Sequence, residues 1–351
     1  MSSTLVGPKI EVIQLLRFVA AAMVLATHTT FYIHERMSSE FPVWFGGESG
    51  VPIFFVISGI VIVLTSSRLS NDWGGAGIFM ERRITRIVPL YWLVTTLKVV
   101  LALALPSAVL HNHFDAVHAL KSYFFIPAFN QAGEIRPIHG VGWTLLHEMY
   151  FYLLFTVAMI VRLRPVWSVT VLLLAAYAYG QFFEPTSAAA IVATSPINLH
   201  FVVGMWVGRV LLGTVPSMSV RILMPVVTGA AIATVIVAGW KMQLDAPALL
   251  IAAVLPLLCA FAFPRRLQVF ARLGDSSYSL YLFHPLIAAG MVAVLAKLGF
   301  TSVLAVFFIA MVGTIVVSHL IHLIVETRLI AVTKSIFHSI GRRMRPLQQA
   351  A

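Results

Sequence analysis

The chain has 351 residues, of which 60% are hydrophobic and only 11% are charged. A soluble globular domain is roughly 25% charged, so this composition excludes a protein with a water-facing surface and indicates an integral membrane protein. The apolar stretches are too long for β-barrel strands of about ten residues. We therefore predict an all-α, polytopic membrane protein of about ten transmembrane helices, built as a single membrane-embedded domain over residues 1–351.

The predicted spans follow one another along the chain, and a basic amphipathic tail at 326–351 follows the last. The first stretch contains Arg17 and lacks a small-residue cleavage site, so we expect it to remain as a span. The tail is expected to lie on the anionic inner leaflet. The spans are expected near 11–31, 48–66, 84–106, 143–162, 166–183, 197–213, 219–240, 247–263, 278–298 and 302–325.

The net charge of +11 has a topological pattern. Of the 24 Lys and Arg residues, 17 fall in the tails, in the even-numbered loops or at the span ends beside them, and five fall in or beside the other loops, while Arg17 and Lys98 lie deeper within spans. This bias is the positive-inside rule, which places both termini in the cytoplasm and removes any need for a nucleic-acid partner. The single cysteine, Cys259, falls in an apolar run and is interpreted as a buried packing thiol.

The first span carries two ionisable residues, Arg17 and His28, eleven positions apart. Eleven residues make three helical turns, so both side chains share one face at an axial separation of about 16 Å. Ionisable side chains within a membrane are costly and usually functional. His28, towards the outer end, could take a proton from an alcohol and return it.

The fourth span begins with GVGWTLLHEMYFY and places Glu148 about one and a half turns into the helix. A carboxylate at this depth needs a partner, and His28 is the attractive one, because a carboxylate can orient an imidazole. A structural pair with another polar group is the alternative. Trp143 fits either an interfacial belt or the floor of a pocket.

The segment ERRITRIVPLYW enters the third span from the cytoplasm with Arg83 and Arg86 on one helix face. Positive-inside anchoring explains such residues, but a paired cluster also suits the phosphates of a cytoplasmic donor. Ser58 lies beside Gly59 in the second span, where either helix packing or a tunnel lining would suit it.

The ninth span opens with SYSLYLFHP, which includes Tyr278, His284 and Pro285. So polar a start, with a proline that weakens the helix, predicts a wet vestibule on the inner side. In the long outer loop, 107–142, the histidines are His111, His113, His118 and His139. Because no carboxylate or thiol cluster accompanies them, we expect a structural or solvated role and no metal site.

Five stretches together resemble the acyltransferase-3 family of integral-membrane acyltransferases, in the branch that O-acetylates bacterial exopolysaccharides. They are RFVAAAMVLATH, GVPIFFVISG, RRITRIVPLYW, GWTLLHEMYFY and SYSLYLFHP, in that order. The resemblance implies a bacterial inner-membrane enzyme that takes acetyl from cytoplasmic acetyl-CoA, as co-substrate and without a bound cofactor. The implied acceptor is a polysaccharide or undecaprenyl-linked sugar, and contact with polysaccharide-assembly machinery and membrane lipid is expected.

The resemblance assigns catalysis to His28 and donor binding to Arg17, Arg83 and Arg86. Glu148 would orient His28, and Ser58, Trp143, Tyr278 and His284 would line the substrate pocket. One departure is Glu326-Thr327-Arg328, where family members often have Glu-Arg-Pro. The alternatives are a secondary transporter or flippase for a lipid-linked sugar, using Arg17, His28 and Glu148 as a proton relay, and a non-enzymatic membrane scaffold.

Overall fold

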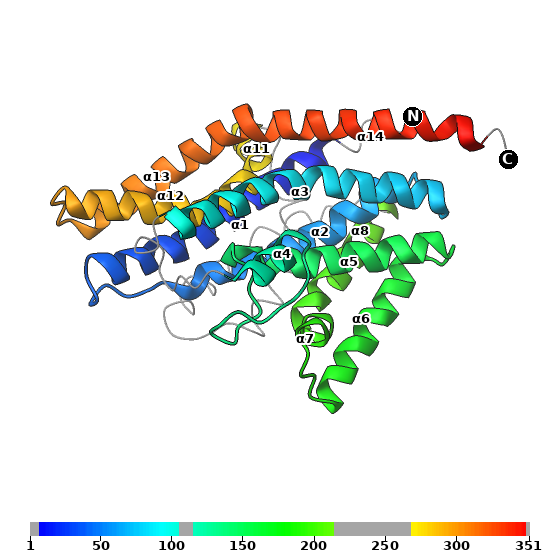
Figure 1. Ribbon diagram of the computed structural model, residues 1–351, viewed down its shortest axis with the longest axis horizontal. Helices are drawn as coiled ribbons and strands as arrows, with labels where there is room; N and C mark the ends of the chain where they lie inside the picture. Colours follow the sequence, from blue (N-terminus) through cyan, green and yellow to red (C-terminus); the bar gives the residue numbers. More distant parts are fainter. Residues whose placement is uncertain (1–6, 105–114, 214–267, 349–351) are drawn as a thin grey trace, which may run out of the picture. The chain divides into compact units, whose positions relative to one another are not determined.

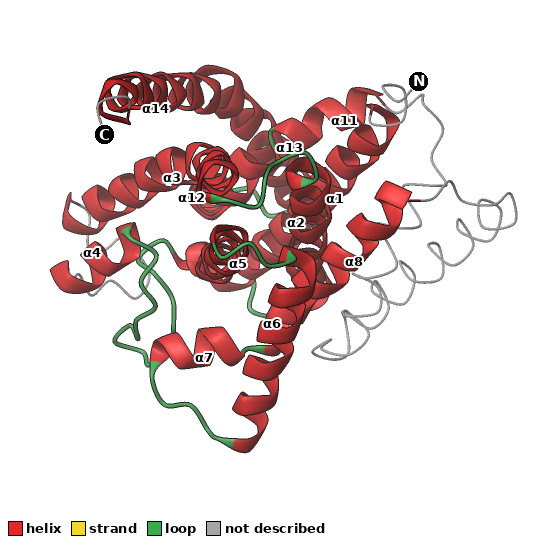
Figure 2. Cartoon of the chain, turned by 90° about the vertical axis from the view of Figure 1, so that its right-hand side faces the viewer, coloured by secondary structure: helices red, strands yellow, loops and turns green. Residues whose placement is uncertain are grey.

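The computed structural model describes residues 7–104, 115–213 and 268–348, and every regular element in these ranges is a helix (Figure 2). This confirms the predicted all-α class. The predicted spans 219–240 and 247–263, together with Cys259, lie outside the described residues.

Seven described helices are long and apolar enough to cross a membrane, and an eighth span is possible if the bent pair Ala188–Thr194 and Pro196–Leu212 is one unit. Each corresponds to one of the eight predicted spans that fall within the described ranges. Large apolar side chains such as Phe182 and Leu304 are exposed on these helices, as contact with lipid requires. The chain is thus a multi-pass membrane protein. The seven are Ile13–Arg36, Phe45–Ser66, Trp73–Ala104, Gly140–Ile160, Pro165–Phe182, Ser277–Lys297 and Val303–Ser339.

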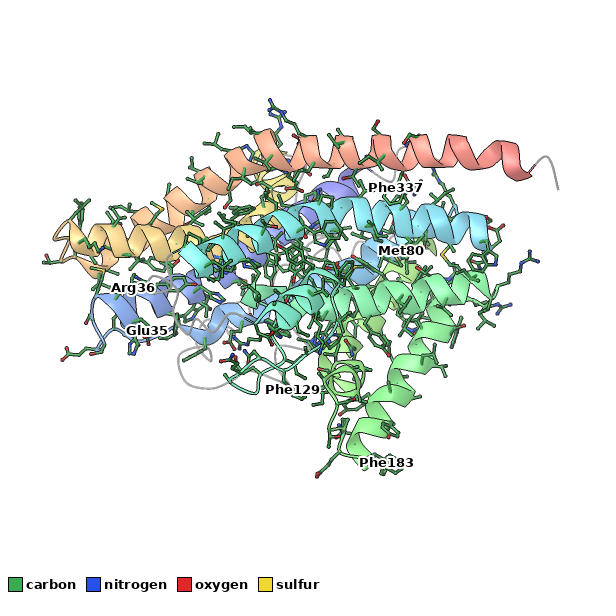
Figure 3. All side chains as sticks on the ribbon, viewed as in Figure 1. Glu35, Arg36, Met80, Phe129, Phe183 and Phe337 are labelled. Carbon is green, nitrogen blue, oxygen red and sulfur yellow. The ribbon has the colours of Figure 1, made fainter. Side chains whose placement is uncertain are left out.

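The described residues form two compact units, one from 1–67 and 195–319 and the other from 68–194 and 320–351. In the first unit, α1 (Gly7–Arg36) packs along α12 (Ser277–Lys297), and the two run in the same direction (Figure 1). Their shared core also includes α13 (Val303–Ile321). Glu35 and Arg36 mark the far end of α1 (Figure 3).

The other end of α1 is held by α11 (Gln268–Asp275). Gln14 Nε2 donates to Asp275 Oδ1 at 2.6 Å. Gly274 brings the two backbones together, because a Cβ there would lie 2.0 Å from the carbonyl oxygen of Gln14. These two contacts give α11 a defined register against α1.

The short η1 (Phe45–Ser49) leads into α2 (Gly50–Ser66), which packs against α8 (Leu199–Gly213). η4 (Pro196–Asn198) precedes α8. A Cβ on Gly59 would lie 2.5 Å from Phe201 O, and one on Gly204 would lie 2.1 Å from Val56 O. Small residues at a membrane helix interface permit this approach. Packing is thus the role the structure gives to Gly59, as one reading of the Ser58-Gly59 pair expected.

The second unit is built on α3 (Trp73–Ala104) and α5 (Trp143–Ile160), with η3 (Gly140–Gly142) before α5. Phe79 of α3 stacks on Phe155 of α5 with ring centroids 5.0 Å apart. α6 (Pro165–Phe182) packs on α5, and α7 (Ala188–Thr194) packs on α6. α3 begins eleven residues before the predicted span, so Arg83 and Arg86 lie inside a helix rather than at its start.

Part of the long loop 107–142 is folded against α3. α4 (Ala116–Tyr123) is capped by Asp115, and the carbonyl of its Ser122 accepts from the Tyr91 hydroxyl at 3.0 Å. Trp92 Nε1 donates to Tyr123 O at 2.8 Å. These bonds fix this part of the loop on the helix. His111 and His113 lie outside the described residues.

The C-terminal tail is a long helix. α13 continues through a π-helical turn, η5 (His322–Glu326), into α14 (Thr327–Gln348), which packs against α3 within the second unit. Phe337, labelled in Figure 3, is a residue of α14. The predicted amphipathic segment is thus helical, and a membrane-surface position for it stays a prediction.

Candidate active site

His28 sits on α1 with a defined tautomer. Its Nδ1 lies 3.0 Å from the carbonyl oxygen of Val24, one turn earlier. A carbonyl can only accept, so Nδ1 carries the hydrogen and Nε2 carries the lone pair of the neutral ring. The ring is half-buried. A backbone carbonyl therefore orients this imidazole and leaves Nε2 as its basic atom.

A second histidine, His284 of α12, lies against the first. The two ring centroids are 4.8 Å apart and the ring planes are inclined by 68°. His284 is fully buried. The sequence predicts His284 in a separate inner vestibule and His28 towards the outer face. That separation was wrong, since the parallel packing of α1 and α12 brings the two rings into contact.

Aromatic rings surround the pair. Tyr32 lies 6.4 Å from His28 and Tyr281 lies 5.9 Å from His284, measured between ring centroids. Phe54 of α2 meets Tyr281 edge-on at 5.6 Å. Three helices of one unit thus converge on the two imidazoles.

The polar start of α12 is largely buried, and the wet vestibule predicted for it stays a prediction. Tyr278 is buried, and Ser276 Oγ donates to Leu273 O at 2.8 Å. Ser58 of α2 and Arg17 of α1 are half-buried in the same unit. Arg17 is three turns of α1 from His28, an axial distance of about 16 Å. Lining of a substrate pocket by Ser58, Tyr278 and His284, and donor binding by Arg17, stay predictions.

In the second unit Arg83 lies over two aromatic rings. Its Cζ is 5.5 Å from the centroid of Phe79 and 5.8 Å from that of Tyr152. Tyr152 in turn donates its hydroxyl hydrogen to Glu148, one turn earlier on α5. Arg83, Tyr152 and Glu148 therefore form one connected group. Cation–π contacts of this kind hold a guanidinium in a fixed plane.

Arg86, one turn after Arg83, is paired with a carboxylate. Its Nη1 lies 2.8 Å from Glu326 Oε1, and His322 Nδ1 lies 2.9 Å from Glu326 Oε2. Glu326 is fully buried, whereas the Arg86 side chain is 30% exposed. The sequence motifs did not reveal Glu326 as the partner of Arg86, or His322 as the second partner of Glu326, although the departure at Glu326-Thr327-Arg328 lies at this place.

Glu148 and His28 belong to different units, so their pairing stays a prediction. Trp143, at the start of α5, meets the ring of His147 edge-on at 5.7 Å. In the loop, His118 Nε2 bonds to Arg136 O at 2.9 Å, and His139 is buried. Within the described ranges, no three His, Cys, Asp or Glu side chains come together as a candidate metal site.

An apolar helical scaffold that holds an imidazole with a basic Nε2, and a half-buried arginine over two aromatic rings, suits a membrane-embedded group-transfer enzyme. Residues 10–323 match the acyltransferase domain family. The chain therefore belongs to this family and is an acyltransferase.

The chain is also similar to a curated relative. The exopolysaccharide production protein ExoZ of Rhizobium meliloti (strain 1021) is 34% identical to it over 279 residues, which are 77% of this chain and 83% of the relative. No solved structure shows significant similarity to it.

Proposed function

We propose that this chain is an O-acetyltransferase that moves acetyl from cytoplasmic acetyl-CoA to a hydroxyl of an extracytoplasmic or lipid-linked sugar of an exopolysaccharide. The membrane is the bacterial inner membrane, where both substrates can meet the protein. The similarity to a protein named for exopolysaccharide production supports the acceptor class. The family supports acyl transfer.

The observation that carries the proposal is the bond from His28 Nδ1 to Val24 O. It leaves Nε2 as the base. His28 Nε2 takes the proton of the sugar hydroxyl as the oxygen attacks the thioester carbonyl. The carbon–sulfur bond then breaks, and the proton passes from His28 to the departing CoA thiolate. All atoms are accounted for as a sugar ester and free CoA.

The arginines supply the donor side of the proposal. Arg83, held over the rings of Phe79 and Tyr152, offers a planar guanidinium to a phosphate of CoA. Arg86 and Arg17 are the further candidate cations. The axial separation of about 16 Å between Arg17 and His28 is comparable to the length of an extended pantetheine arm. Glu148 is proposed as an additional partner of the imidazolium.

The test is the ester content of the extracellular polysaccharide, measured by NMR for cells that carry wild type or His28→Ala. We expect the acetate signals to disappear with His28→Ala while the protein remains in the membrane. His34→Ala is the matched control, because His34 lies on the same helix and also bonds a backbone carbonyl, that of Phe41. Unchanged acetylation with His28→Ala would overturn the proposal.

A second experiment separates an acetyltransferase from a flippase that uses the same residues. Purified protein is given labelled acetyl-CoA and polysaccharide from cells that lack the chain. An acetyltransferase should transfer the label to the polysaccharide. A transporter would leave the thioester intact.

A further inference from the structure

The contact between His28 and His284 joins two ionisable side chains of membrane-spanning helices, each of which is rare in such a helix. Their ring centroids are 4.8 Å apart, closer than those of His28 and Tyr32 at 6.4 Å. His284 is 0% exposed. An apolar residue would fill this buried position at a lower desolvation cost, so the imidazole of His284 is expected to have a function beside the proposed base.

His284 is held by a bond that the sequence provides for. Pro285 has no N–H, so the carbonyl of Tyr281, four residues earlier, loses its usual helical donor. His284 Nδ1 lies 2.7 Å from this carbonyl oxygen and supplies the missing hydrogen. The ring is thereby fixed, and its neutral form has the lone pair on Nε2.

Both imidazoles therefore have the same tautomer and the same kind of anchor. Each donates from Nδ1 to a backbone carbonyl of its own helix, Val24 for His28 and Tyr281 for His284. The rings are in contact, so positive charges on both at once would repel each other.

Other titratable groups of the unit are arranged around this pair. Tyr32 and Tyr281 contribute neutral phenols in ring contact. Arg17 lies three turns of α1 away, while His34, Glu35 and Arg36 lie beyond His28 towards the far end of that helix. On the elements packed against α1, the described titratable groups are Glu48 of η1, Arg272 and Asp275 of α11, Tyr278, Tyr281 and Lys297 of α12, and His319 of α13.

We propose that His284 is a positioning residue for His28, and that the two rings hold the transferred proton as a pair. The inference rests on the proposed function and deepens it. His28 Nε2 takes the hydroxyl proton, and the neutral His284 ring stabilises the resulting imidazolium by its orientation and its lone pair. When the carbon–sulfur bond breaks, the proton leaves the pair for the CoA thiolate, and both rings return to the neutral state.

Four variants separate this role from a structural one. His284→Asn keeps a donor for the Tyr281 carbonyl and removes the ring. His284→Phe keeps a ring edge without nitrogen. His284→Gln offers an amide near the position of Nε2. Pro285→Ala restores a backbone N–H for Tyr281 and leaves both histidines in place.

Each variant is purified in detergent and given labelled acetyl-CoA and polysaccharide from cells that lack the chain. We expect His284→Asn and His284→Phe to lower kcat roughly 10- to 100-fold, with little change in the KM for acetyl-CoA. His284→Gln should recover part of the loss. Pro285→Ala should lower kcat less than His284→Asn does, because its new N–H competes with His284 Nδ1 for the Tyr281 carbonyl but leaves the ring in place. The acid limb of the pH–rate profile should move in His284→Asn, since the coupling to His28 is gone.

A double variant, His28→Ala with His284→Asn, should be no slower than His28→Ala, because residues that act as one unit are not additive. If His284→Asn only lowers the melting temperature, and its kcat and pH profile superimpose on those of the wild type, the inference is overturned. If His28→Ala retains transfer, the proposed function fails first. The two failures are therefore distinguishable.

Discussion

Arg86 and Glu326 form a salt bridge of 2.8 Å across 240 residues of sequence, joining α3 to the π-turn before α14. The buried carboxylate also accepts from His322 at 2.9 Å. Glu326 is 0% exposed, so its charge is stabilised by these two donors rather than by water. π-turns recur at functional sites, and this one brings His322 and Glu326 together on one face.

Removing the carboxylate should cost stability. Glu326→Gln leaves Arg86 without its opposite charge, although partial exposure of the guanidinium limits the loss to about 1–3 kcal/mol. The measurement is the melting temperature in detergent. Glu134→Gln is the control, because the Arg136–Glu134 pair is 3.5 Å long and about half exposed on each side. A Glu326→Gln melting temperature equal to that of the control would contradict the prediction.

A double variant of Arg86 and Glu326 distinguishes a structural role of Arg86 from a role in donor binding. Replacing both residues by methionine removes the buried charges together and should restore much of the stability lost in Glu326→Gln. If Arg86 also binds acetyl-CoA, the double variant will be stable and yet have a KM for acetyl-CoA raised about tenfold. A stable double variant with wild-type KM would restrict Arg86 to a structural role.

Arg83 offers a sharper test of donor binding. Lysine keeps the charge but cannot reproduce the planar fork or the stacking over Phe79 and Tyr152. We expect Arg83→Lys to raise the KM for acetyl-CoA about tenfold, with a smaller effect on kcat. Arg82→Lys is the matched control, since Arg82 is the adjacent residue and is exposed. Equal KM values for the two variants would argue against the assignment.

The contact of α2 with α8 depends on glycine. In Gly204→Ala the new Cβ would lie 2.1 Å from Val56 O, which is backbone and cannot turn aside. We expect a loss of roughly 1–3 kcal/mol, seen as a lower melting temperature. Gly290→Ala tests the same change on α12, where nothing lies within 4 Å of the new Cβ. This control should be neutral or slightly stabilising, because alanine is the better helix former.

Asp72 makes a pH-dependent contribution to the stability of the folded protein. Its Oδ1 accepts from the backbone N–H of Gly75 at 2.8 Å at the start of α3, and this bond and that of Ser70 lower the pKa of the carboxyl below 3.8. Because the pKa is lower in the folded state, the ionised carboxylate stabilises the folded protein above the pKa of the unfolded state. This stabilisation is lost as the pH falls through the pKa of the folded state. Asp72→Asn keeps a cap without the charge. The difference in melting temperature between wild type and Asp72→Asn should therefore shrink below about pH 4; a difference that is constant with pH would contradict this.

Apolar length was enough to locate the described candidate spans, because each must cover about 30 Å of hydrocarbon. It could not find the start of α3, whose first eleven residues include Glu81, Arg82 and Arg83 and are helical without being span-like. Asp72, three residues before the Gly75 N–H that it caps, was the available signal. The pairings of His28 with His284, and of Arg86 with Glu326, join distant segments and follow from tertiary packing, which helical periodicity does not encode.

The parallel neighbours α1 and α12 also set an order of assembly. His284 follows His28 by 256 residues, so the ribosome makes the helix that carries the proposed base long before it makes the helix that carries His284. During that interval the nascent α1 presents Gln14, Arg17 and His28 to the lipid or to the insertion machinery, without α11 and α12 beside them. Contacts of such long sequence separation form late. A chain interrupted before α12 would thus contain the proposed base, His28, and still lack the His284 ring that lies against it.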